Sequence, residues 1–180
     1  LCLMRYIDIH SKELFCAPEK NFLSVISFRD DKAAVEEIDQ FCQDMMGIEW
    51  VPVLTAPTDI HLPWRDGGLS KRAFRLPREV RPEEDKWLCS FSLGIVQSGT
   101  VQSKVLKSFL GWDKPIDPRV IALQLIRLGQ SFTVDVNLNQ VMSLQVPKIY
   151  QSLAASCQHD SVTLEKVKTL LNGTSWIWVG

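Results

Sequence analysis

Residues 109–119 read FLGWDKPIDPR, and this stretch decides how the second half of the chain is arranged. Apolar residues recur at helical spacing before it, so a helix is expected to enter the stretch and to end near Leu110. Gly111 can take the left-handed backbone conformation that is costly for other residues, and Pro115 cannot continue a helix. The first half of the stretch therefore predicts a sharp helix end.

The second half of the same stretch predicts a new helix. Asp117 can accept a hydrogen bond from an unpaired backbone N–H, and Pro118 suits the first helical position, where its missing N–H had no partner. The residues that follow, VIALQL at 120–125, continue an apolar helical pattern. We therefore predict a helix-turn-helix hinge at 109–120.

The composition is that of an ordinary folded globular protein. Of 180 residues, 46% are hydrophobic and 23% are charged, and the formal net charge is -1. This balance argues against a dedicated nucleic-acid binder, although the first half is more acidic than basic and the second half is the reverse. We expect a single domain over 1–180, with a mixed α/β sub-unit 1–98 and a mainly helical sub-unit 99–180 as the alternative.

The cysteines are widely spaced and include no CxxC motif, which is typical of buried thiols in a reducing compartment. They are Cys2, Cys16, Cys42, Cys89 and Cys157. This cysteine pattern predicts a cytoplasmic location. No apolar run has the length of a membrane span. The start at Leu1, without an initiator Met or a signal-peptide pattern, and the strand-like SWIWVG at 175–180 suggest a piece excised from a longer protein.

The hydrophobic pattern predicts an α+β fold that is predominantly helical, with five to six helices and a small sheet of short strands. A long loop-rich stretch is expected at 56–86, where Pro and Gly recur. Helices are expected over 2–15, 31–46, 101–110, 118–128, 149–157 and 161–171, with a short helical segment over 22–26. Strands are expected over 48–55, 73–76 and, with strand favoured over helix, 87–97. Residues 131–146 fit either a strand or a helix, and Pro147 is expected to reset the pattern.

One cluster of basic residues is the candidate partner-binding site. It consists of Arg65, Lys71, Arg72, Arg75, Arg78 and Arg81. Such a cluster could bind an acidic partner, or it could simply be a solvated loop, which is the commoner situation. Stacking aromatic residues, which a single-strand nucleic-acid binder needs, are few in this stretch.

Other constellations predict no chemistry. DGGLSKR at 66–72 has glycines and cations but lacks the spacing of a phosphate-binding loop. Cys157 with His159 has no further zinc ligands nearby, and Asp59 with His61 serves no nucleophile motif. We therefore expect no catalytic, cofactor-binding or metal-binding residues. The six tryptophans are expected to anchor the ends of elements, with their N–H groups donating to carbonyls.

Several stretches together resemble the repeat regions of the sacsin family. These are the hinge with its VIALQL continuation, KIYQSL at 148–153 and WIWVG at 176–180. VPVL at 51–54, LPW at 62–64 and FRLP at 74–77 are also similar to that family's order of helix, strand, loop and strand. The resemblance therefore runs over the whole chain.

The resemblance implies a giant cytosolic protein built from large repeats, each of which begins with an ATP-binding fold similar to that of Hsp90. Its other modules include a ubiquitin-like domain, a J domain and a nucleotide-binding helical domain. The family is implicated in chaperone work, intermediate-filament organisation and mitochondrial dynamics. The present chain has neither the ATP-binding motifs nor the HPD of a J domain, so those activities are not expected in it.

The sequence thus leads to two main hypotheses about function, with an enzyme or nucleotide binder as the weakest third. The first is a non-catalytic structural or interaction module whose partners are neighbouring repeats, protein clients and chaperone or cytoskeletal proteins, with no cofactor, nucleic acid or membrane. Self-association is compatible with it, through surfaces that excision would uncover. The alternative is a client- or partner-binding module that uses the basic loop 65–81.

Overall fold

The computed structural model describes residues 2–16, 31–54, 73–130, 136–158 and 160–177. Among these residues the helices are α1 Cys2–Ile9, α2 Ser11–Phe15, α3 Asp31–Gly47, α4 Lys86–Cys89, α5 Lys104–Phe109, α6 Pro118–Gln130, α7 Val136–Cys157 and α8 Ser161–Leu171, with two 3-10 helices, η3 Pro77–Glu79 and η4 Glu83–Asp85. The strands are β1 Val51–Pro52, β2 Phe74–Arg75, β3 Val80–Pro82 and β4 Gly94–Val96. The predominantly helical α+β class is confirmed.

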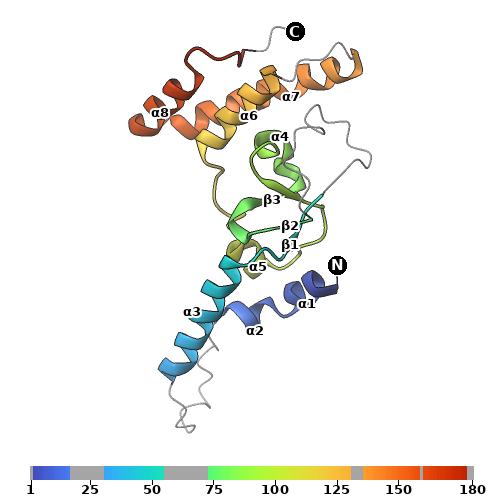
Figure 1. Ribbon diagram of the computed structural model, residues 1–180, viewed down its shortest axis with the longest axis vertical. Helices are drawn as coiled ribbons and strands as arrows, with labels where there is room; N and C mark the ends of the chain where they lie inside the picture. The colour runs from blue at the N-terminus through green and yellow to red at the C-terminus, as the bar shows by residue number, and fades with distance from the viewer. Residues whose placement is uncertain (1, 17–30, 55–72, 131–135, 159, 178–180) are drawn as a thin grey trace.

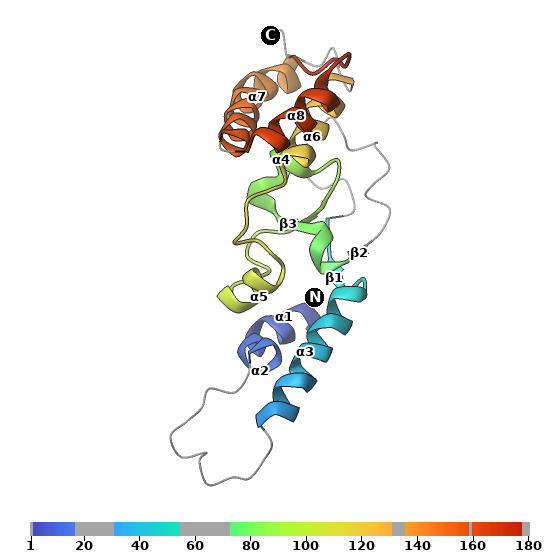
Figure 2. The ribbon, with the colours of Figure 1, turned by 90° about the vertical axis from the view of Figure 1, so that its left-hand side faces the viewer.

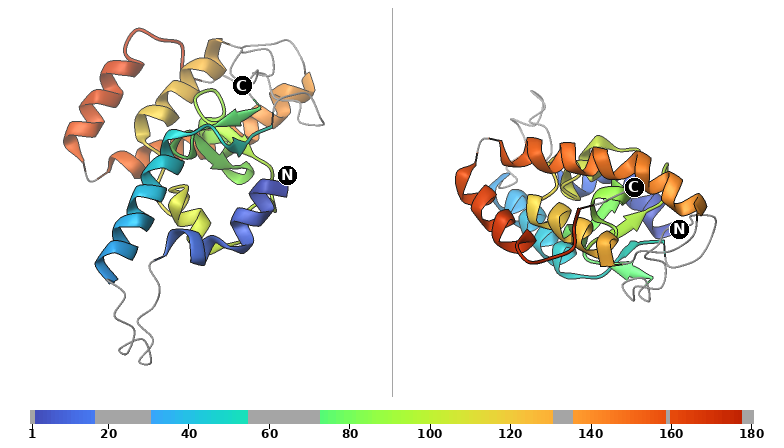
Figure 3. Two further views of the ribbon diagram at one scale, coloured as in Figure 1. Left: turned by 60° about the horizontal axis from the view of Figure 1, so that its bottom comes forward. Right: turned by 90° about the horizontal axis from the view of Figure 1, so that it is seen from above.

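The molecule is elongated, with the short strands between two groups of helices (Figures 1 and 2). α1, α2, α3 and α5 gather at one end, and α6, α7 and α8 lie at the other. Viewed along the long axis, α6, α7 and α8 cover their end of the molecule (Figure 3). The strands therefore join two helical layers.

The described strands form two small sheets. β1 pairs antiparallel with β2, and Pro52 lies opposite Phe74 in an edge strand, as the proline predicts. β3 pairs parallel with β4. The N–H of Leu54 donates to the carbonyl of Ile95 at 2.8 Å, and this bond connects the two sheets.

Two hydrophobic clusters hold these layers together. The first is formed by Met4, Ile7, Trp50, Val51, Val80, Val96, Val101, Leu106 and Leu110. The second is built mainly from α4, α6, α7 and α8, around Cys89, Ile121, Leu125, Ile149 and Val167. α5 belongs to the first cluster and α6 to the second, so the two clusters meet at the hinge. Whether they make one domain or two sub-units stays a prediction.

The predicted helix over 2–15 is wrong in one respect, because it is broken into α1 and α2 at His10. The hydroxyl of Ser11 donates to the carbonyl of Asp8 at 2.9 Å and contacts the hydroxyl of Ser103 at 2.5 Å. A serine that bonds back to the preceding turn competes with the helical backbone and bends it. A contact from α5, far away in the sequence, thus coincides with the break.

The favoured strand over 87–97 is correct only in its second half. Residues 86–89 form α4, and β4 begins at Gly94. Three acidic residues at 83–85 precede α4, and the turn after it closes when the N–H groups of Ser92 and Leu93 donate to the carbonyl of Cys89. Acidic residues before a helix favour its start.

Pro147 does not reset the pattern as expected, because α7 runs through it from Val136 to Cys157. The ambiguity over 131–146 is resolved as helix from residue 136 onward, and residues 131–135 lie outside the described part. Val146 and Ile149 are only 2% and 0% exposed. Their packing into the second cluster compensates for the hydrogen bond that the proline removes. The short helix expected over 22–26 also lies outside the described residues.

Gly129 does not end its helix, because α6 continues to Gln130. A side chain at this position would clash, since an added Cβ would lie 2.0 Å from the carbonyl oxygen of Ser175. The glycine therefore lets the segment after α8 cross closely over the last turn of α6.

We predict that Gly129→Ala destabilises the protein by about 1–3 kcal/mol, as overpacking does, despite the gain of up to about 1 kcal/mol in helix propensity. Urea unfolding measures the difference. Gly47→Ala is the matched control, because a Cβ there meets nothing within 4 Å. Equal midpoints for the two variants would contradict the close crossing at Ser175.

Candidate functional site

The hinge begins with a tight helix end around Gly111. The N–H of Trp112 donates to the carbonyl of Lys107 at 2.9 Å, and the N–H of Gly111 donates to that of Ser108 at 2.9 Å. This pair of bonds is the Schellman motif, which needs a left-handed residue at its centre. The φ of Gly111 is 71°, so the predicted helix end is confirmed.

The hinge ends where Asp117 begins α6, again as predicted. Its Oδ1 accepts from the backbone N–H of Arg119 at 2.9 Å, and its carboxylate also receives the guanidinium of Arg119. The hydrogen bond from the Arg119 side chain is the main reason that the pKa of Asp117 lies below its ordinary value. The charge of Asp117 is therefore already paired.

Arg81 links β3 to the hinge. Its Nε and Nη2 both lie 2.8 Å from Oδ2 of Asp85. Its Nη1 donates to the carbonyl oxygens of Gly111 at 2.8 Å and Lys114 at 3.1 Å. The side chain is only 12% exposed. Arg81 was predicted as a partner-binding residue, but its guanidinium is engaged by groups of the same chain.

Two of the described tryptophans, Trp50 and Trp112, act as anchors as expected. Nε1 of Trp112 donates to the carbonyl of Val80 at 3.2 Å, next to the Arg81 bonds. Nε1 of Trp50 donates to the carbonyl of Met45 at 2.9 Å. Trp112 and Arg81 together hold the hinge against the start of β3.

Asp8 joins the first helix to α5, a link that sequence reasoning missed. Its carboxylate accepts the backbone N–H groups of Gln102 at 3.0 Å and of Ser103 at 2.8 Å. The hydroxyl of Ser103 in turn accepts from the first N–H groups of α5. An acid on a helix surface gives no sequence signal of such a distant partner.

Gln124 is a second missed link, and it is completely buried. Its Oε1 accepts from the N–H of Phe91 at 2.9 Å, and its Nε2 donates to the hydroxyl of Ser90 at 3.1 Å. A buried amide with satisfied hydrogen bonds orients the elements that it joins, here α6 and the turn after α4. The signal was a lone polar residue inside the apolar run VIALQLI.

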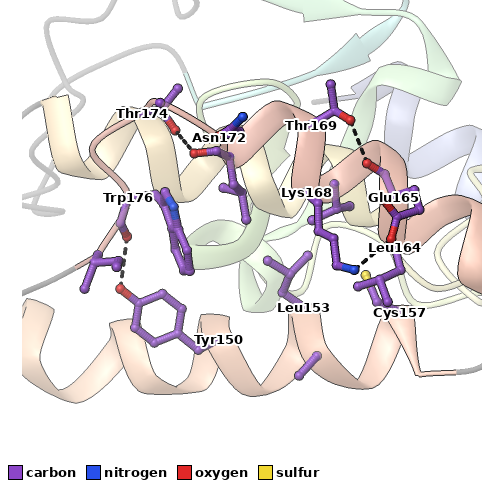
Figure 4. A pocket seen from close by; sticks show the side chains of 15 residues that line it. Tyr150, Leu153, Cys157, Leu164, Glu165, Lys168, Thr169, Asn172, Thr174 and Trp176 are labelled. Carbon is purple, nitrogen blue, oxygen red and sulfur yellow. Dashed lines mark hydrogen bonds and ion pairs between the residues drawn. The ribbon is translucent and has the colours of Figure 1, made fainter.

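A groove of about 1070 Å³ lies between α7, α8 and the segment that follows α8 (Figure 4). Most of its lining is apolar. The hydroxyl of Tyr150 donates to the carbonyl of Trp176 at 3.0 Å, and their rings meet edge to face. Lys168 at the rim is paired with Glu165 at 2.7 Å. These contacts hold the C-terminal segment against α7.

The cysteines are partly as expected. Cys89 and Cys157 are buried, but Cys16 is exposed and Cys42 is half-buried. Burial raises the pKa of the Cys157 thiol, with a smaller contribution from Asp160, and raises that of Cys89 to about 12. A thiol with a raised pKa is a poor nucleophile, which disfavours catalysis at Cys157.

Apart from Arg81, the predicted basic cluster divides into three parts. Arg65, Lys71 and Arg72 lie outside the described residues. Arg75 is half-buried in β2, and Arg78 is exposed on η3. Arg78 is therefore the described member of the cluster whose exposure suits a partner.

Arg78 lines a depression of about 330 Å³ beside the hinge, which we call the hinge pocket. Lys114 lines the same pocket and is also exposed. Apolar residues around Val80, Leu110 and Ile116 make up most of the remaining lining, and Arg81, Ser108 and Asp117 also contribute to it. The sequence did not indicate Lys114, because it lies outside the basic cluster and reaches the pocket only through the fold.

The described residues contain no group of three or more His, Cys, Asp or Glu side chains that could hold a metal ion. The helices in that part of the chain include none with the length and hydropathy to cross a membrane. No protein-family model, curated protein or solved structure matches the chain.

We predict that Arg81→Ala destabilises the protein by about 2–3 kcal/mol, because Asp85 loses its partner and two hinge carbonyls lose their donor. Arg81→Lys should recover only part of the loss, since an ammonium cannot form the same fork. Chemical unfolding measures both. Arg119→Ala is the control, because its ion pair is exposed and should leave the midpoint unchanged. An equal effect of both alanine variants would contradict the role of Arg81.

A pH-dependent prediction concerns Glu83 in η4. The N–H of Ser98 donates to its Oε2 at 3.1 Å, and Lys86 Nζ lies 3.3 Å from its Oε1. The pKa of Glu83 is therefore below its ordinary value of 4.5, chiefly because of the Ser98 N–H. A lowered carboxyl pKa stabilises the fold above the ordinary value, and this stability is lost as the pH falls through the lowered pKa.

Glu83→Gln should accordingly destabilise the protein by about 1 kcal/mol at neutral pH. The difference from wild type should become smaller in acid, as the pH falls toward the lowered pKa of Glu83, and unfolding midpoints at pH values of about 7 and 3 measure it. Glu165→Gln, in an exposed pair, is the control. A difference that is the same at both pH values would show that the charge of Glu83 is not involved.

Proposed function

We propose that this chain is a non-catalytic structural and interaction module of a sacsin-type cytosolic protein. The observation that supports this most strongly is the link made by Arg81, whose mostly buried charge fixes the hinge. Gln124 and Asp8 have similar roles in linking distant elements. These three polar side chains therefore hold distant elements of the chain in position.

The motifs behind the family resemblance have architectural positions, which also supports the proposal. In the hinge motif, Gly111 forms the helix end and Trp112 is bonded to β3. In KIYQSL, Tyr150 holds the C-terminal segment at Trp176 of WIWVG. In VPVL, Leu54 connects the two sheets. A module that sets the geometry between neighbouring repeats would need these residues.

The proposal is tested by titrating the chain with ATP, Mg²⁺ and Zn²⁺ while following thermal unfolding and the small-angle scattering profile. We expect no change in Tm and one elongated shape throughout. A site filled at 100 times its Kd would stabilise the fold by about 2.7 kcal/mol, which is a rise of roughly 5–10 °C for a chain of this size. Such a rise would contradict the non-catalytic assignment.

The alternative is that the loop 65–81 binds a client protein, and the exposure of Arg78 favours it. In this alternative, Arg81 fixes the end of the loop to the hinge. Substitutions at Arg72 and Arg78 would test whether the loop binds a partner. In this alternative the chain binds acidic surfaces of clients or of neighbouring repeats.

A further inference from the structure

The hinge pocket brings together two cations that are far apart in the sequence. Arg78 belongs to η3, and Lys114 belongs to the turn between α5 and α6. Arg81 makes this possible, because its Nη1 donates to the carbonyl of Lys114 itself and fixes that residue beside β3. The fold therefore holds the backbone of Lys114 beside β3.

The carboxylates near the pocket do not neutralise these two cations. Asp85 is paired with Arg81, and Asp117 is paired with Arg119. Asp113 accepts the hydroxyl of Ser108 at 2.8 Å and does not line the pocket. Among the described residues, neither Arg78 nor Lys114 has an ion pair, so the rim of the pocket carries positive charge.

Most of the remaining lining is apolar, although Arg81, Ser108 and Asp117 also line the pocket. Val80, Leu110 and Ile116 are 1%, 3% and 8% exposed, and each belongs to one of the two hydrophobic clusters. At about 330 Å³ the depression has room for one or two side chains. Positive charge at the rim and apolar groups inside are complementary to an apolar side chain that is flanked by carboxylates.

We propose that the hinge pocket docks an acidic segment of a partner protein, with an apolar side chain inserted between Arg78 and Lys114 and neighbouring carboxylates on these cations. This proposal rests on the partner-binding alternative above. It differs in placing the binding site at the hinge pocket and not in the loop 65–81. Arg81 is a positioning residue, because it acts through the backbone of Lys114.

The test measures the anisotropy of a fluorescent twelve-residue peptide in which Glu and Leu alternate, at low salt. Arg78→Glu with Lys114→Glu should weaken binding at least about ten-fold, and alanine at both positions at least about three-fold. The same peptide with Gln in place of Glu should bind at least about ten-fold more weakly. Circular dichroism verifies that the variants fold. We expect them to fold because the substituted side chains are exposed.

Two controls separate this pocket from general charge and from the loop. Arg127→Glu with Lys148→Glu reverses the same number of exposed charges elsewhere and should leave binding unchanged. An equal loss in this control, or equal binding of the Gln peptide, would overturn the proposal.

Arg72→Glu is the second control and should have little effect on binding. If it abolishes binding while the pocket variants bind normally, the loop is the site and the pocket is not. If neither loop nor pocket variants alter binding, both the pocket and the partner-binding alternative fail.

Discussion

The structure depends on one constraint, which is the position of the hinge relative to β3. The two hydrophobic clusters are formed by different helices and meet between α5 and α6. Arg81 and Trp112 fix that junction with three hydrogen bonds to backbone carbonyls on both sides of it. Without them the two helical layers would be joined by a short turn and by two sheets of two or three residues per strand.

Local signals in the sequence were sufficient for the parts of the fold that local physics controls. The end of α5 at Gly111 and the start of α6 at Asp117 follow from the steric freedom of glycine and from side-chain capping. The start of α8 at Asp160 has the same basis, since its carboxylate accepts the N–H groups of Val162 and Thr163. These interactions span only a few residues and leave a pattern in the sequence.

Features that depend on distant partners could not be predicted in this way. Pro147 normally interrupts a helix, but buried neighbours in α7 maintain it. Gly129 resembles a helix end, but its role is to admit Ser175. Arg81 lies in the basic cluster of the sequence, but in the structure it binds the backbone of the hinge. Lys114 lies outside that cluster, but in the structure it lines the hinge pocket. For the candidate site, the sequence therefore identified the kind of charge but not which residues would gather.

The link between Asp8 and the start of α5 also has a consequence for how the protein forms. The first cluster joins α1 to Val96, Leu106 and Leu110, and Asp8 bonds to residues nearly 100 positions further along the chain. Closing so long a loop is entropically expensive before any contact is made. On the ribosome, this end of the molecule must wait until α5 has emerged, whereas α6, α7 and α8 can pair soon after they are made.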